Sequence, residues 1–357
     1  MKIYKSIFLM LLMVSVFIGC DNVEDSNIVE NNQNNPGGND WLIPSTEIFD
    51  GGPGKDGIPA LTNPKLTDIN SISYLDDNDL VIIVKEGEEV RVYPHPILDW
   101  HEIINDNIGD KSFALTYCPL TGSGISWDRI INGVETTFGV SGLLYNTNLI
   151  AYDRLTNSNW SQMKMQSVNG KLISTVTKTY PIIETSWLTA KTLYQNSRVV
   201  PTSTGHSRNY GRYPYGNYRT NHSSLIFPVN NTDNRLNAKE RVLGVFNNSL
   251  HKAYRILDFQ EPSVFIDEFG GTRFLVYGDN KNNLITAFEL NNLFLGKTFK
   301  KSSLSLPFII EDDSGNHYDI FGKSSETGKP DLVTAKSFIA YWFAWAAFYP
   351  NTELYKN

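Results

Sequence analysis

The sequence predicts a β-rich α+β protein, with two degenerate copies of one β-sheet unit that are each closed by a short helix. Three observations lead to this fold class. Short apolar runs alternate with clusters of Gly, Asn, Asp and Pro, the second half repeats residue patterns of the first, and helical spacing is convincing in only two segments.

The N-terminus has the pattern of a secretory signal peptide over residues 1–19. Lys2 and Lys5 precede an apolar run over residues 7–18, and Gly19 and Cys20 follow it. This arrangement is typical of a lipoprotein that is cleaved before Cys20 and lipidated on that residue. A transmembrane helix is the alternative, but the run is shorter than the roughly 20 residues that span a bilayer. We therefore expect a protein of the cell envelope that has the membrane as a partner through its lipid, on the periplasmic side or the cell surface.

Residues 20–40 should form a tether between this lipid and the folded body. The segment is rich in Asn and has few large apolar residues. Such a composition buries too little surface to offset the entropy of ordering the chain. The body is then expected to begin at Trp41.

Composition limits what the body can do. The net charge is −7 and the two signs are interspersed, so no basic stripe is present to bind nucleic acid, and we expect no nucleic-acid partner. The chain has two cysteines, and lipidation of Cys20 would leave Cys118 without a disulfide partner. Cys118 is then either a buried small apolar residue or a thiol kept for its chemistry.

Strands are predicted in order along the first half. Residues 80–85 and 90–93 flank a turn at Glu86 and Gly87, and a further strand covers 113–117. Residues 124–131 and 134–140, which meet at Asn132 and Gly133, give the strongest hairpin signal. A last strand is predicted over 149–153.

The second half repeats this pattern. Residues 84–93 correspond to 245–254, residues 97–100 to 256–259, and residues 109–116 to 270–277. The ends correspond as well, with Trp187 opposite Trp342. We therefore predict a first repeat over 41–235, including the connection between the copies, and a second repeat over 236–357.

The two helices are predicted at the ends of these copies. Residues 187–193 and 337–348 are each followed by residues that stop helices. The aromatic residues of the second segment recur at steps of three and four, which places them on one face. This face is either packed in the core or open to a ligand.

From residue 50 onward the chain resembles the DUF3179 family of prokaryotic proteins. The matching motifs have the family's order and spacing, and they include residues 54–61, 93–106, 116–120, 138–146, 152–154, 160–162, 208–215 and 342–349. The resemblance implies an exported protein and brings no accepted activity. Members often continue Cys-Pro-Leu with Cys-Gly, but Thr121 stands here, so a two-cysteine site is excluded. Members also often carry His-Pro where this chain has Tyr194 and Gln195.

Cys118 and His101 are the candidate catalytic residues. Cys118 is expected at the end of an apolar strand, before a turn that could offer free backbone N–H groups to an oxyanion. His101 is the nearest base in sequence, and Glu102 could orient it. The alternative is a buried cysteine and a histidine with a surface or capping role.

A polar set in the first repeat is the candidate ligand site. Asp128, Asp153 and Arg154 could bind a polar small molecule or a glycan, or they could only form ion pairs that fix the sheet. The connecting loop over 208–219 could close over the site as a lid or clasp the repeats together. The residues expected to line the pocket beside Cys118 and His101 are Trp100, Asp128, Tyr145, Asp153, Arg154, Trp160, Arg208 and Tyr210.

No metal or cofactor is expected. The six histidines show no metal-binding spacing, although His95, His101 and Cys118 could converge on copper or zinc. Residues 51–55 resemble a phosphate-binding loop in composition only. They lack the Ser or Thr that follows the lysine, so this type of site is excluded.

The functional expectation is an extracytoplasmic protein with a polar small-molecule or glycan site, which could be an enzyme that uses Cys118. The alternative is a binding or scaffold protein of the envelope. The surroundings of Cys118 should separate the two. An enzyme needs an exposed Cys118 near His101 with a lowered thiol pKa, whereas a scaffold would bury it among apolar residues.

Overall fold

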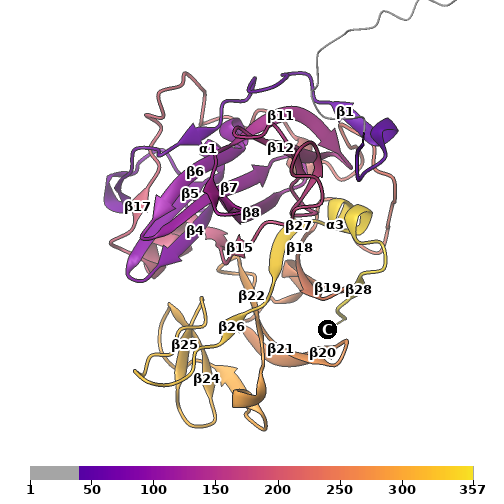
Figure 1. The fold of residues 1–357 in the computed structure, drawn as a ribbon. Coiled ribbons are helices and arrows are strands. Elements are labelled where there is room, and N and C mark those ends of the chain that lie inside the picture. Colours follow the sequence, from indigo (N-terminus) through magenta and orange to yellow (C-terminus); the bar gives the residue numbers. More distant parts are fainter. Residues whose placement is uncertain (1–39, 357) are drawn as a thin grey trace, which may run out of the picture. The chain divides into compact units, whose positions relative to one another are not determined.

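The structure is a computed structural model, and it describes residues 40–356. Strands dominate this part of the chain, which confirms the β-rich class (Figure 1). The expected signal peptide, the lipidation site Cys20 and all of the tether before residue 40 lie outside the described residues. Within the described part, no helix is long and apolar enough to span a membrane.

Three five-stranded sheets make up the first half. The element orders, with bounds, are β16 (Ile183–Ser186), β4 (Leu80–Glu86), β5 (Glu89–Pro94), β17 (Arg198–Val199), β3 (Thr67–Asp68); then β15 (Thr179–Tyr180), β8 (Ser123–Asp128), β7 (Lys111–Cys118), β6 (Ile103–Ile108), β2 (Leu61–Thr62); and β1 (Ile48–Asp50), β11 (Phe138–Tyr145), β12 (Asn148–Asp153), β13 (Asn159–Ser161), β14 (Gln166–Asn169). A two-stranded ribbon, β9 (Ile130–Ile131) and β10 (Val134–Glu135), accompanies them.

The second half has three smaller sheets. Their orders are β27 (Ser337–Tyr341), β18 (Arg241–Asn247), β19 (Leu250–Arg255), β28 (Glu353–Leu354); then β20 (Ser263–Phe269), β21 (Thr272–Asp279), β22 (Leu284–Glu289), β26 (Val333–Thr334); and β23 (Phe299–Lys301), β24 (Phe308–Asp312), β25 (His317–Asp319).

The described residues contain three seven-residue α-helices, α1 (His95–His101), α2 (Trp187–Leu193) and α3 (Trp342–Phe348). The sequence predicted α2 with its observed bounds. It predicted α3 five residues too early, because residues 337–341 pair with β18 as a strand. It did not predict α1, a helix of two turns whose N-terminus holds Pro96, because so short an element leaves almost no periodicity to detect.

The hairpin expected at Asn132 and Gly133 is shorter than predicted. Only β9 and β10 pair across this turn, with two residues each. The long flanking strands turn elsewhere, since β8 pairs with β7 and β11 pairs with β12. Both turn residues have positive φ, 51° and 80°, which explains why the local signal is strong.

The two halves share similar sheet connections. In the first half β4 and β5 lie between β16 and the parallel strand β17, and in the second β18 and β19 lie between β27 and the parallel strand β28. The sheet of β1 and β11–β14 belongs to the first half alone, and that of β23–β25 to the second. The duplication itself stays a prediction.

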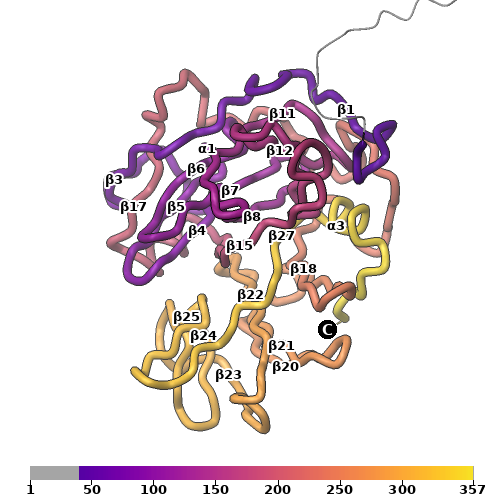
Figure 2. The backbone as a smooth tube through the Cα atoms, viewed as in Figure 1, coloured from indigo at the N-terminus to yellow at the C-terminus, as the bar shows by residue number. Residues whose placement is uncertain are grey.

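The halves meet through one large apolar core. It contains Trp127 and Trp160 from the first half, and Trp342 and Trp345 from α3. The backbone N–H of Tyr341 donates to the Thr121 carbonyl at 2.8 Å, next to the end of β7. Figure 2 shows the yellow C-terminal segment with β27 beside β8 of the first half. The aromatic face predicted for residues 337–348 is therefore core.

Candidate functional site

A cavity of about 300 Å³ lies where the end of α1, the end of β7, strands β11 and β12 and the connection between β17 and β18 meet. Its walls are mostly aliphatic and aromatic side chains: Ile58, Leu120, Val140, Leu143, Leu144, Leu149, Phe227. The polar side chains that line it are Asp99, Trp100, Glu102, Cys118, Arg208, Tyr215. Trp100, Cys118 and Arg208 were among the residues expected at one pocket.

Asp99 and Glu102 are the two carboxyl groups of this cavity. They are 4% and 6% exposed, so both are nearly removed from water. Burial raises the pKa of Asp99 to about 8, although the nearby Arg219 opposes the shift and Asp79 adds to it. Burial also raises the pKa of Glu102 to about 8, with Tyr215 opposing and Asp99 adding to the shift. Both groups therefore hold a proton at neutral pH.

Neither carboxyl group has an opposite charge within 4.0 Å among the described residues. Oδ1 of Asp99 is buried and has no hydrogen-bond partner there. Glu102 accepts one long hydrogen bond, from the Tyr215 hydroxyl at 3.5 Å. A desolvated carboxyl group with few partners costs free energy, so this pair destabilises the fold.

The backbone of Glu102 ends α1 in a strained conformation. Its φ is 56°, a region that residues with a side chain rarely adopt. Its N–H donates to the Leu98 carbonyl at 2.8 Å, and its carbonyl accepts the Tyr117 N–H of β7 at 2.6 Å. These bonds hold the turn that brings the Glu102 side chain to the cavity. Conformations of this kind cost on the order of 1 kcal/mol or more and gather at functional sites.

Cys118 lines the same cavity as a buried, neutral thiol. It is 1% exposed, and its Sγ donates to the Thr147 carbonyl at 3.7 Å. Burial, with a contribution from the charge of Glu102, raises the pKa of Cys118 to about 11. A thiol with this pKa is a poor nucleophile at neutral pH.

His101 does not pair with Cys118. Its Nδ1 lies 2.7 Å from the Pro59 carbonyl and its Nε2 lies 2.7 Å from the Tyr210 hydroxyl, so both nitrogens have other partners. Burial lowers the pKa of His101 to about 4, while the hydrogen bond to Pro59 opposes this shift. The catalytic dyad expected from the sequence is thus not formed. Cys118 is thus buried, is not paired with His101 and has a raised pKa, which are the surroundings expected of a scaffold and not of an enzyme.

Six of the eight expected ligand residues do not line this cavity: Tyr210, which is described below, and five others. Asp153 and Trp160 are fully buried, and Asp153 accepts the Trp160 Nε1 hydrogen at 3.1 Å. Arg154 pairs with Asp56 at 2.9 Å. Asp128 accepts the Tyr180 hydroxyl at 2.9 Å, and Tyr145 bonds Asn230 at 3.1 Å. They were expected to converge on one pocket, but Asp128 lies on β8 in a different sheet from Tyr145, Asp153 and Trp160, and each of the five has partners outside the cavity.

The connection between β17 and β18 both lines the cavity and is fastened to its rim. Arg208 and Tyr215 line the cavity, and Tyr213 and Tyr218 donate hydrogen bonds to the Pro119 and Leu120 carbonyls at 3.1 and 3.0 Å. Tyr210 is 7% exposed and does not line the cavity; its hydroxyl is hydrogen-bonded to His101. The loop thus lies against the cavity and is fixed to the segment after β7, and the lid and clasp roles stay predictions.

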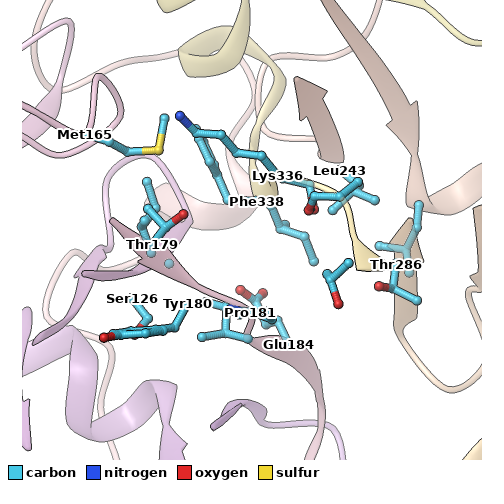
Figure 3. Close-up of a pocket in the computed structure, with 18 of the residues that line it drawn as sticks. Ser126, Met165, Thr179, Tyr180, Pro181, Glu184, Leu243, Thr286, Lys336 and Phe338 are labelled. Atoms are coloured by element: carbon cyan, nitrogen blue, oxygen red, sulfur yellow. The ribbon is translucent and has the colours of Figure 1, made fainter. Parts of the chain in front are cut away.

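A second cavity, of about 360 Å³, lies between β8, β15 and β16 of the first half and β18, β22 and β27 of the second. Figure 3 shows Glu184 and Thr286 on facing segments of its wall. Burial alone would raise the pKa of Glu184, but Arg241 and His95 outweigh it and hold this pKa below its usual value. Glu184, the only acid among the described residues that line this cavity, is therefore ionised, and Arg241 balances its charge.

Sequence reasoning did not identify Asp99 or Tyr215 as residues of the cavity. It considered Glu102 only as a group that could orient His101. Asp99 lies in the last turn of α1 and Glu102 in the left-handed turn that ends it, and neither the helix nor its end was predicted. Residues 40–356 contain no group of three or more His, Cys, Asp or Glu side chains arranged to hold a metal ion.

Comparison with known proteins gives one match. Residues 55–352 match the family described as protein of unknown function DUF3179. No curated protein matches the chain, and no solved structure matches it.

Proposed function

This chain belongs to the DUF3179 family, and from that starting point we propose that it binds a small amphipathic molecule in the cavity of Asp99 and Glu102. The observation that carries the proposal is a cavity with apolar walls around two buried carboxyl groups that form no ion pair among the described residues. Binding sites for small molecules combine mostly apolar walls with a few placed polar groups in this way.

The expected ligand changes in one respect from that inferred from the sequence. A polar molecule or glycan needs many hydrogen-bonding partners, whereas the wall here offers mainly Leu143, Leu144, Leu149 and Phe227. An apolar body with one polar group fits these surroundings better. Catalysis through Cys118 finds no support, because the thiol is buried, neutral and without a base.

We further propose that the protein is carried on the envelope by a lipid on Cys20, facing the periplasm or the cell surface. The support is the sequence of residues 1–20 alone. The duplication is likewise part of the proposal, supported by the matching residue patterns and by the similar order of the strands around β4–β5 and β18–β19.

A fragment screen on the full chain tests the proposed function. Small aromatic and aliphatic compounds would be screened by ligand-observed NMR, against the wild type and Leu143→Trp, which fills the cavity from its wall. Leu188→Trp, at a residue 51% exposed on α2, is the matched control. We expect binding that Leu143→Trp abolishes and Leu188→Trp retains. Binding that survives in both Leu143→Trp and Ile58→Trp would favour the scaffold alternative.

A further inference from the structure

The acids of the cavity differ from other buried acids in the described structure. Asp106 pairs with Arg91 at 2.7 Å, Asp319 pairs with Lys85 at 3.3 Å, and Glu184 pairs with Arg241. Asp99 and Glu102 are as deeply buried and have no such partner. Asp153 and Asp312 are buried without a cation, but each accepts several hydrogen bonds. Asp99 and Glu102 lack both kinds of partner, which points to a ligand with donors and a positive charge.

We propose that the cavity binds an organic ammonium ion, a molecule with an apolar body and one protonated amine that lies between Asp99 and Glu102. This proposal rests on the proposed function and specifies its ligand class. The unpartnered Oδ1 of Asp99 and the weakly bonded carboxyl of Glu102 provide the acceptors, and a primary ammonium group brings three N–H donors. The aliphatic wall covers the apolar body.

The protonation of the cavity agrees with this ligand class. With pKa values near 8, the carboxyl groups keep their protons at neutral pH, which avoids a buried unpaired charge. An arriving ammonium ion would favour the ionised carboxylate instead. The complex then replaces one buried proton with one buried ion pair, and charge-assisted hydrogen bonds of this type are the strong ones.

Other ligand charges fit less well. A divalent metal ion needs three or more ligands, and no such group occurs among the residues described. An anion would face two carboxyl groups. The cations nearby are at the rim: Arg208 is exposed and donates to the Ser207 carbonyl, and Arg219 lies 4.2 Å over the Tyr213 ring. Neither forms an ion pair with Asp99 or Glu102, so neither competes with an ammonium group for a carboxyl group that ionises when the ligand binds.

Isothermal titration calorimetry of the full chain with benzylamine and benzyl alcohol tests the inference. The probes have nearly the same size and differ in the charged group. We expect benzylamine to bind at least about tenfold more tightly, which is the effect of one hydrogen bond to a charged group. Titration in two buffers of different ionisation enthalpy should also show that a carboxyl group releases a proton when benzylamine binds and that none is released when benzyl alcohol binds.

Variants identify the site. Asp99→Asn and Glu102→Gln should each weaken benzylamine binding by about tenfold and leave benzyl alcohol within about twofold. Asp110→Asn, at an exposed acid away from the cavity, is the matched control and should change neither. Thermal melting establishes that each variant is folded. If one of Asp99→Asn and Glu102→Gln fails to fold, the other still tests the inference.

The outcomes separate the inference from the proposed function. Equal affinity for both probes, with binding lost in Leu143→Trp, would overturn the ammonium class and retain the ligand pocket. Binding of neither probe, or binding unaffected by Leu143→Trp, would overturn both.

Discussion

The Nε2 atom of His101, at the end of α1, lies 2.7 Å from the hydroxyl of Tyr210 in the connection between β17 and β18. Because His101 Nδ1 donates to the Pro59 carbonyl, Nε2 is the acceptor and Tyr210 the donor. The Tyr210 oxygen in turn lies 2.6 Å from the Thr204 hydroxyl. This chain of hydrogen bonds fixes the connection at the helix that carries Asp99.

Tyr210→Phe is expected to lower the free energy of unfolding by about 1 to 2 kcal/mol, because it leaves the buried Nε2 of His101 without a donor. Urea denaturation measures the change. Tyr194→Phe is the matched control, since the Tyr194 hydroxyl is buried and has no hydrogen-bond partner. Its removal should cost nothing. Equal losses in both variants would contradict the role given to the hydrogen bond.

Asp99→Asn is expected to make the protein more stable at pH 7.5 and to have little effect near pH 4. The pKa of Asp99 is about 8 in the folded protein and about 3.9 in an unfolded chain, so between these values only the folded state keeps the proton. The free energy of unfolding therefore falls as pH rises through this window, by up to about 1.4 kcal/mol per pH unit. Asn carries no such dependence. Urea denaturation at several pH values measures this pH dependence, with Asp110→Asn as the control. If Asp99→Asn destabilises the protein equally at every pH, the prediction is wrong.

Glu184→Gln is expected to destabilise the protein by about 3 kcal/mol at pH 7, because it leaves Arg241 without its buried counter-charge. Burial opposes the ionised form of Glu184, but Arg241 and His95 prevail and lower its pKa. The stabilisation by ionised Glu184 is thus present above its pKa in the unfolded chain and is lost as pH falls through its lower pKa in the folded protein. The loss of unfolding free energy in Glu184→Gln should therefore become smaller in acid.

The double variant Glu184→Gln with Arg241→Met should recover part of this loss, since no unpaired charge remains. Asp77→Asn, which breaks the exposed pair with Lys191, should cost less than about 1 kcal/mol. Chemical denaturation of the three variants measures both effects. A deficit in Glu184→Gln no larger than that in Asp77→Asn would refute the prediction.

Cys118 is expected to resist thiol reagents in the native protein. With a pKa of about 11 it forms on the order of 100-fold less thiolate at pH 8 than an ordinary cysteine, and it is 1% exposed. A Cys20→Ser chain, whose one thiol is Cys118, would be titrated with a chromogenic disulfide before and after unfolding in guanidinium. Native and unfolded rates within a few-fold of each other would restore the nucleophile hypothesis.

Cys20→Ser is expected to abolish incorporation of a labelled fatty acid and stable membrane attachment, because Cys20 is the expected acceptor. Cys118→Ser is the matched control and should keep the label. Metabolic labelling followed by membrane fractionation measures both. Equal labelling of the wild type and Cys20→Ser would count against the lipoprotein.

The sequence by itself determined the β-rich class, the hairpin of β4 and β5, the helix α2 and membership of the family. These features depend on local periodicity, on turn residues and on the order of motifs, all of which are written along the chain. It also placed Trp100, Cys118 and Arg208 at a common site, through their presence in those motifs.

Only the tertiary structure decided what the site is. Asp99 on α1, Leu149 on β12 and Tyr215 in the connection are far apart in sequence, and their meeting depends on how the sheets pack. The same packing removes water from Asp99, Glu102 and Cys118, and this desolvation sets their pKa values. Burial is a property of the whole fold, so the neutral thiol and the uncompensated carboxyl groups could not be read from neighbouring residues.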